Sequence, residues 1–392
     1  MSTQGAPSVR FTHTSPQQGF KLLELPPELL NLLTSDDAPI IEIKTPSKII
    51  QSTASSDGRE FINLCTPSQT YRVRQVQSSN SIHVMKPSEV PPDATSLNPE
   101  DAFVSSMTAI AKCGSTLELH TPPEGFGVCL MLQNGLRVYD RLSSEGPMMD
   151  MDMDMDMEDT SMGGGNDINQ RVARERLFAD VPVSREQCEK GWVDLCAFVH
   201  GSPGTCWRPS AVVRLDVWKR VMEGSILQGI DLEKQFLILD LWKAVRDDDD
   251  DDDEEPFPRP LFDAVIRRLC DSETIREEFK WASIDRLLCI QWVGETYLEA
   301  MAPMATSAIT RNEFLNAWRD HLPESWREEV ALSKLTEGCY ALPEPTTIYH
   351  TSETERERIK RGIQRGGTTA ASAAATAKTT RNWHELFKSQ RR

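Results

Sequence analysis

The sequence predicts an α+β protein in which an N-terminal β-barrel-like domain is followed by tandem winged-helix modules. Short apolar runs with a period of two, separated by Pro, Gly, Ser and Asp, extend from Gly19 to about Arg141 and are typical of strands joined by turns. A low-complexity stretch at 143–166, with a Met-Asp repeat, then interrupts the pattern. Beyond it, apolar residues recur with the helical period, and short strand-like runs close groups of helices.

The N-terminal third is expected to hold short strands and little helix. Pro26 and Pro27 stand where the first turn of a helix tolerates missing N–H groups, so a short helix is expected within 24–36, and a second one at 98–112. Strands are expected at PIIEIKT (39–45), REFINLCT (59–66), YRVRQVQ (71–77), SIHVM (81–85) and GVCLML (127–132). A small, partly open barrel of this kind leaves edges that favour strand addition by a partner; a self-contained domain with capped edges is the alternative.

The remainder is expected to be built of helices that are followed by short strands. Two helix starts, at Ser184 with Gln187 and at Thr310 with Glu313, have the capping-box pattern. The expected helices are 168–178, 184–198, 210–223, 231–245, 261–270, 284–301, 310–321 and 326–334. Strand-like runs at 205–209, 277–283 and 338–351 close three groups of these helices, which is the outline of tandem winged-helix modules; a purely helical bundle is the alternative.

These patterns predict a division of the chain into seven parts. They are a disordered N-terminus (1–17), a β-barrel partner-binding domain (18–145), an acidic linker (146–166), winged helix 1 (167–209), winged helix 2 (210–283) with an acidic insertion at 247–255, winged helix 3 (284–351) and a basic flexible tail with a short terminal helix (352–392).

The net charge of −17 is unevenly distributed. Six carboxylates lie between Asp150 and Asp159 and nine follow one another at 247–255, so the rest of the chain is nearly neutral. From Glu353 to Arg392, ten Lys and Arg residues outnumber four Glu residues. The acidic total therefore does not exclude DNA binding. It marks the middle module as the least suited to DNA and the tail as a candidate for it.

In a winged helix, the helix before the wing usually contacts a DNA groove or another protein. The corresponding helices here are 184–198, 261–270 and 326–334. Together with the wings they carry seven candidate DNA-binding residues: Lys190, Arg208, Arg267, Arg268, Lys280, Arg327 and Lys334. The alternative is that these are ordinary basic residues on solvated helix faces.

No catalytic activity, metal or cofactor is expected. The chain has no GxxxxGK[ST] loop, GxGxxG loop, GxSxG elbow or HExxH pair. Cys196, His200 and Cys206, with Cys188 nearby, lack the spacing of a zinc finger or ribbon, so core cysteines are expected. No apolar stretch approaches the roughly 18 residues of a membrane span and no signal peptide is evident, so an intracellular chain without a membrane is expected.

Three stretches together resemble one known family. GFKLLELPPELLNLL (19–33), CTPSQTYRVRQVQSSNSIHVM (65–85) and FLNAWRDHLPESW (314–326) resemble, in order and spacing, the eukaryotic family named for defective sister chromatid cohesion. That family is an accessory subunit of the alternative replication factor C clamp loader. The resemblance extends from about Gly19 to Thr351, and both acidic tracts look like insertions.

The resemblance implies partners for both halves of the chain. The β domain would bind the small cohesion subunit and the C-terminal tail of the large clamp-loader subunit. The winged helices would bind single- and double-stranded DNA and DNA polymerase epsilon, and the sliding clamp would be reached indirectly, in the nucleus. Candidate partner-binding residues are Leu22, Leu23, Leu25, Tyr71 and Val73 and, in the terminal helix, Trp383, Leu386 and Phe387. An acidic histone-binding chaperone or another nuclear adaptor is the alternative.

Overall fold

The computed structural model describes residues 10–45, 62–89, 105–122, 127–140, 165–201, 204–246, 256–270 and 280–356. The chain forms two compact units. Unit 1 comprises Met1–Phe126 and Pro182–Gln187, and unit 2 comprises Gly127–Val181 and Cys188–Arg392. The first boundary between the two units thus falls at Phe126, whereas the sequence predicts a domain boundary at residue 145. The mixed α+β class is confirmed.

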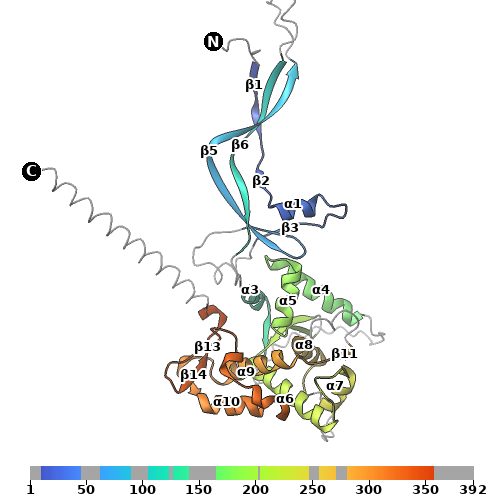
Figure 1. Cartoon of the computed structure of the whole chain (residues 1–392). Coiled ribbons are helices and arrows are strands. Elements are labelled where there is room, and N and C mark those ends of the chain that lie inside the picture. Colours follow the sequence, from blue (N-terminus) through green and yellow to red (C-terminus); the bar gives the residue numbers. More distant parts are fainter. Residues whose placement is uncertain are drawn as a thin grey trace, which may run out of the picture. The chain divides into compact units, whose positions relative to one another are not determined.

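Unit 1 is a curled, half-barrel sheet (Figure 1). Its strands are β1 (Arg10–Gly19), β2 (Leu22–Glu24), β3 (Glu42–Lys44), β4 (Ile62–Cys65), β5 (Thr70–Glu89) and β6 (Ser105–His120). Their order is β1-β6-β5-β4-β3, and β2 also pairs with β6. The expected short helix is confirmed as α1 (Pro27–Leu33).

Two predictions for unit 1 were wrong. Residues 10–17, expected to be disordered, belong to β1, because Phe11 and its neighbours pair in parallel with β6 around Met107. Of the helix expected at 98–112, residues 105–112 instead form the start of β6, and residues 98–104 lie outside the described residues. Small residues on β6, including Ala109, Ala111 and Cys113, are buried and alternate with more exposed ones. Alanine-rich sequence favours a helix locally, but the long pairing with β5 overrides that preference.

The end of the sheet at β3, β4 and β5 is covered on both faces. On one face, Leu29 of α1 packs against Leu64 and Tyr71, which form the buried core of the described part of unit 1. On the other face, the amide of Asn63 donates a 2.6 Å hydrogen bond to the carbonyl of Pro182. The segment Pro182–Gln187 therefore belongs to unit 1, although it lies far from the strands of that unit in the sequence.

Unit 2 contains three successive groups of elements with a similar order: a helix, a strand, two helical segments (three in the third group) and two strands (a bridge and a strand in the second group). The first has α3 (Val128–Gly135), β7 (Arg137–Tyr139), α4 (Gly165–Asp180), α5 (Arg185–Asp194), β8 (Phe198–His200) and β9 (Thr205–Pro209). The second has α6 (Ala211–Leu227), β10 (Phe236–Leu237), α7 (Ile238–Arg246), α8 (Arg259–Leu269), a bridge at Cys270 and β11 (Trp281–Ala282).

The third group has α9 (Arg286–Met301), a 3-10 turn η4 (Ala305–Ser307), β12 (Ile309–Thr310), α10 (Arg311–Asp320), the 3-10 segments η5 (Glu324–Glu329) and η6 (Leu332–Lys334), β13 (Tyr340–Ala341) and β14 (Thr347–His350). In each group the last strand lies between the other two: the orders are β7-β9-β8 and β12-β14-β13, and in the second group β11 pairs with β10 while Ile284, just after it, pairs with Cys270. The three groups are called repeats 1, 2 and 3 below.

Two predictions for unit 2 were also wrong. The run 127–132, expected to be a strand, begins α3 and buries Met131 and Leu132. A short continuous apolar run does not distinguish a buried strand from a buried helix. The helix expected at 326–334 is divided into η5 and η6. The break falls at Val330 and Ala331, whose backbone is extended, and Trp326 and Leu335 are each buried in the core on either side of it.

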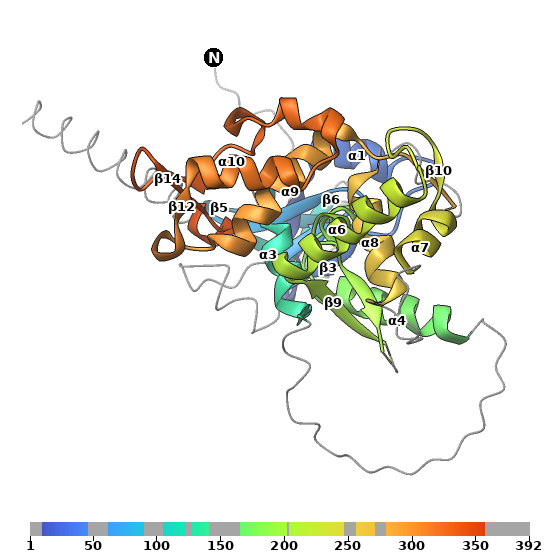
Figure 2. The same cartoon turned by 90° about the horizontal axis from the view of Figure 1, so that it is seen from below.

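A single large core joins the repeats of unit 2. Helix α9 packs against both α6 and α10 (Figure 2). Trp318 of α10 is fully buried, and its indole N–H donates a 2.9 Å hydrogen bond to the carbonyl of Ile290. Among the described residues, no helix has the length and apolar character needed to cross a membrane.

Candidate functional site

An apolar margin at the β3 edge of unit 1 lies uncovered. Ile43 pairs with Leu64 and Ile62 pairs with Val73, and cross-strand partners share a face of the sheet. This is the face on which α1 packs, yet 73% of Ile43 and 44% of Ile62 are exposed. Ile40, just before β3, is 85% exposed. The apolar face therefore continues past α1 at Ile43 and Ile62, while Ile40 adds an exposed apolar side chain next to the start of β3. We call Ile40, Ile43 and Ile62 the β3 margin.

The predicted partner-binding residues of unit 1 occupy different environments. Tyr71 is buried, and its hydroxyl donates a 2.7 Å hydrogen bond to Oε1 of Gln69. Leu25 and Val73 are half-buried and pack against the same small core. These three side chains build the sheet of this chain. Leu22 and Leu23 lie on β2, beside β6, and Leu23 is partly exposed.

Sequence reasoning missed the exposed members of the β3 margin. The sequence predicts a strand at PIIEIKT (39–45) without indicating which of its side chains are exposed; in the structure Ile40 and Ile43 are exposed and Ile41 packs on the core. The available signal was that Ile40 and Ile41 are adjacent, so both faces of the strand are apolar. That pattern is typical of a strand covered on both sides.

The structure brings together two of the candidate DNA-binding residues, Lys190 and Arg268. Nε of Arg268, on α8, lies 3.5 Å from Oδ1 of Asp194 on α5. Lys190 is exposed on the same helix α5, and both it and Arg268 act electrostatically on the thiol of Cys129. Arg267 is half-buried, and burial lowers the pKa of its guanidinium. Lys190 therefore offers an accessible charge, while Arg268 is paired within the unit.

The other candidates lie on other elements of unit 2. Lys280 is exposed immediately before β11 of repeat 2. Arg327 and Lys334 are exposed on η5 and η6 of repeat 3, and Nε of Arg327 donates a 3.1 Å hydrogen bond to the carbonyl of Leu322. Among the contacts of the described residues, none joins these positive side chains to Lys190.

Arg208 belongs to a mostly buried ionic cluster that draws on all three repeats. Nη2 of Arg214 on α6 donates a 2.6 Å hydrogen bond to Oε2 of Glu299 on α9. Burial would raise the pKa of Glu299, but Arg214, then His350 and Arg208, hold it below its ordinary value. Burial lowers the pKa of Arg208 and of His350, and Glu299 partly opposes both shifts. The cluster stabilises unit 2 where β9, α6, α9 and β14 meet.

The cysteines are free thiols in largely apolar surroundings. Cys188 and Cys196 are buried and Cys206 is half-buried. Burial raises the pKa of the Cys196 and Cys206 thiols to about 11, which keeps them protonated and unreactive near neutral pH. Within the described ranges, no group of three or more His, Cys, Asp or Glu side chains could hold a metal ion.

Comparison with known protein families shows to which family the chain belongs. The family described as Sister chromatid cohesion protein Dcc1 matches residues 20–355, which is most of the chain. The chain belongs to the Dcc1 family. Its role is therefore in sister chromatid cohesion, and the resemblance found in the sequence is confirmed. A search of curated proteins found no significant match.

The Dcc1 match covers residues of both units, and both acidic tracts lie within its range. It ends at residue 355, so the basic tail lies beyond it. The acidic tract 247–255 and the candidates Trp383, Leu386 and Phe387 lie outside the described residues. The family description names no enzymatic activity.

Proposed function

We propose that this Dcc1-family chain is a non-catalytic accessory subunit of the alternative replication factor C clamp loader. The observation that carries the proposal is the β3 margin of unit 1. Ile40, Ile43 and Ile62 present apolar surface beside β3, an edge strand within the described sheet. Another chain that covers these side chains and pairs with this edge would stabilise both. The proposed occupants are the small cohesion subunit and the C-terminal tail of the large clamp-loader subunit.

Affinity capture of the complex tests this assignment. The full chain is co-expressed with the small cohesion subunit and the large subunit, and the captured material is identified by mass spectrometry. Ile43→Asp with Ile62→Asp should reduce recovery of both partners about tenfold or more, because it places charge in a desolvated interface. The matched control is Ile226→Asp with Leu227→Asp, two similarly exposed side chains of α6, which should leave recovery unchanged.

Undiminished recovery with the β3 margin variant would overturn the assignment. Capture of histones in place of clamp-loader subunits would favour the acidic chaperone instead. Circular dichroism of each variant distinguishes a lost interface from a lost fold, since the far-ultraviolet spectrum should match that of the unchanged chain.

We further propose that the three repeats of unit 2 are winged-helix modules that contact DNA, and that repeat 2, whose range includes the acidic tract, contributes least to this contact. The shared element order and the central place of the last strand in each sheet support this interpretation. Lys190, Lys280, Arg327 and Lys334 are the exposed candidates for phosphate contacts. Arg208 is assigned instead to the ionic cluster. The same modules are the proposed contact for DNA polymerase epsilon, and the nucleus is the proposed location.

The salt dependence of DNA affinity tests the phosphate contacts. Binding of the full chain to single- and double-stranded DNA is measured between about 50 and 200 mM salt, where the logarithm of the affinity should fall linearly with the logarithm of the salt concentration. Arg327→Ala with Lys334→Ala should reduce that slope by roughly one for each lost contact. Lys243→Ala, an exposed lysine on α7 near the acidic tract, is the control. Equal slopes for all three proteins would contradict the assignment.

A further inference from the structure

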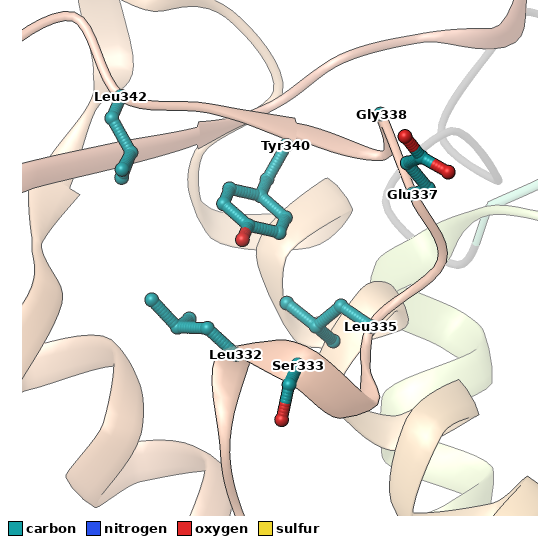
Figure 3. Close-up of a pocket in the computed structure, with 7 residues that line it drawn as sticks. All are labelled: Leu332, Ser333, Leu335, Glu337, Gly338, Tyr340 and Leu342. Atoms are coloured by element: carbon teal, nitrogen blue, oxygen red, sulfur yellow. The ribbon is translucent and has the colours of Figure 1, made fainter.

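Repeat 3 carries an apolar groove between η6 and β13. Leu332 and Leu335 line one side and Tyr340 and Leu342 line the other, around a cavity of about 490 Å³. Figure 3 shows Tyr340 and Leu342 pointing toward the two leucines, with Glu337 at the rim. A volume in the range of about 300–1,000 Å³ accommodates a small molecule or several side chains of a partner.

The lining of the groove is only partly covered by the chain itself. Leu335 is buried and Leu332 and Tyr340 are half-buried against the core, whereas Leu342 is 44% exposed. Four convergent apolar side chains around one hollow differ from a scattered exposed leucine, which needs no explanation. The groove therefore has the character of a docking site.

The described chain ends beside this groove. After β14, the backbone N–H of Thr351 donates a 2.8 Å hydrogen bond to the carbonyl of Cys339, which lies between two lining residues. A Cβ atom at Gly338, itself part of the lining, would lie 3.7 Å from Cδ of Arg356. Residues 357–392 thus continue from a point at the rim of the groove.

These following residues have the chemistry that the groove would accept. They contain nine Lys and Arg residues and two Glu residues. Trp383, Leu386 and Phe387 are spaced as i, i+3 and i+4, which places them on one face of a helix. Near the groove, the exposed carboxylates of Glu337 and Glu344 complement the basic residues beside that apolar trio.

We propose that the C-terminal segment 381–392 docks in the groove of its own chain, with Trp383, Leu386 and Phe387 against the four apolar lining residues. The connecting residues 357–382 span up to about 85 Å when extended, far more than the groove requires. A tether of this kind gives the docking segment an effective concentration that approaches the mM range, so a weak intrinsic affinity suffices. The inference is independent of the proposed function, because it requires neither DNA nor a partner subunit.

Photo-crosslinking of the full chain tests the docking. Phe387 is replaced by benzoylphenylalanine, the monomeric protein is irradiated at low concentration, and crosslinked peptides are identified by mass spectrometry. We expect crosslinks within one chain between residue 387 and the segment 332–342. Leu342→Asp should reduce their yield about tenfold, since it places a charge in the groove. Leu287→Asp, on an equally exposed leucine of α9, should not reduce it.

A second pair of variants probes the segment itself. Trp383→Asp should remove the crosslinks and Ser389→Asp should retain them. Crosslinks to any other region, or their absence, would overturn the proposal. Mixing isotopically light and heavy chains reveals crosslinks that join two copies, and a predominance of these would also overturn it.

Discussion

In the mostly buried ionic cluster of unit 2, the charged residues shift the pKa values of one another. The side chain of Arg214 is 14% exposed, and that of its partner Glu299 is 38% exposed. Solvent therefore partly screens this ion pair, and the pair stabilises the fold by about 1 kcal/mol. In a wholly buried pair, by contrast, removal of one partner would cost several kcal/mol of stability. Nε of Arg208 and Nε of Arg214 are buried and have no hydrogen-bond partner. Removal of another member of the cluster would therefore leave still more buried polar groups unsatisfied and lower the stability of unit 2.

We predict that mild acid destabilises unit 2 through His350. Burial lowers the pKa of this imidazole below its ordinary value of 6.5, against Glu299 and Glu295, which raise it, and alongside Arg356 and Arg214, which lower it. Below pH 6.5 the unfolded chain binds a proton that the folded chain resists, so the free energy of unfolding falls as the pH falls, by at most about 1.4 kcal/mol per pH unit.

Denaturant unfolding between pH 7.5 and 5 measures this effect. His350→Gln should flatten the dependence in the upper part of that range, whereas His200→Gln, on an exposed histidine of β8, should leave it unchanged. An identical pH dependence in His350→Gln would exclude the role. At lower pH, protonation of Glu299, whose pKa lies below its ordinary value of 4.5, would add a further loss in both variants.

At the scale of elements, two close helix crossings set the packing of unit 2. A Cβ atom at Gly294 of α9 would lie 2.5–2.9 Å from ring atoms of Trp318. At Gly224 of α6, a Cβ atom would lie 3.1 Å from the backbone of Ala244 on α7. The missing side chains therefore allow the Trp318 ring of α10 to pack directly on the backbone of α9, and the backbone of α7 to pack closely on α6.

We predict that Gly294→Ala destabilises the chain in spite of the higher helix propensity of alanine. The indole of Trp318 is fully buried and is held by its hydrogen bond to Ile290, so it cannot yield to the added methyl group. Overpacking of this kind costs about 1–3 kcal/mol. Thermal or urea unfolding measures the loss. Leu287→Ala, at an exposed position of the same helix, should change stability by less than about 0.5 kcal/mol.

At the scale of the whole molecule, the two units differ in how much apolar surface they bury. Within the described part of unit 1, Leu29, Leu64 and Tyr71 form a small buried cluster, and other buried residues of its sheet, such as Ala109, Ala111 and Cys113, have small side chains. The core of unit 2 runs through all three repeats and includes the fully buried Trp218 and Trp318. Because a smaller core offsets less conformational entropy, unit 1 should be the less stable of the two in isolation from a partner.

We predict that unfolding of the isolated chain is not a single transition. All nine tryptophans lie at or beyond residue 192, outside the ranges of unit 1. Far-ultraviolet circular dichroism, which includes a contribution from the sheet of unit 1 in addition to the helices of unit 2, should therefore begin to change at a lower urea concentration than tryptophan fluorescence. Coincident curves would contradict this expectation. Binding of the proposed subunits should shift the first transition upward, since a ligand of the folded state stabilises it.

The sequence by itself determined the elements that local patterns specify. The strands around Tyr71, the helix after Pro26 and the capped start of α10 at Thr310 follow from residues only a few positions apart, and all are present. The same is true of membership in the Dcc1 family, which rests on the order of such stretches along the chain.

Only the tertiary structure decided what distant residues do to one another. Pairing with β5 made a strand of residues 105–112, contact with helices of unit 2 made a helix of 128–135, and Arg214 with Glu299 drew Arg208 into a mostly buried cluster. It also decided that Ile43 is exposed while Ile41 packs on the core. These outcomes depend on partners that lie tens of residues or more away in the sequence. The residues around an apolar or basic side chain therefore do not specify which partner it contacts.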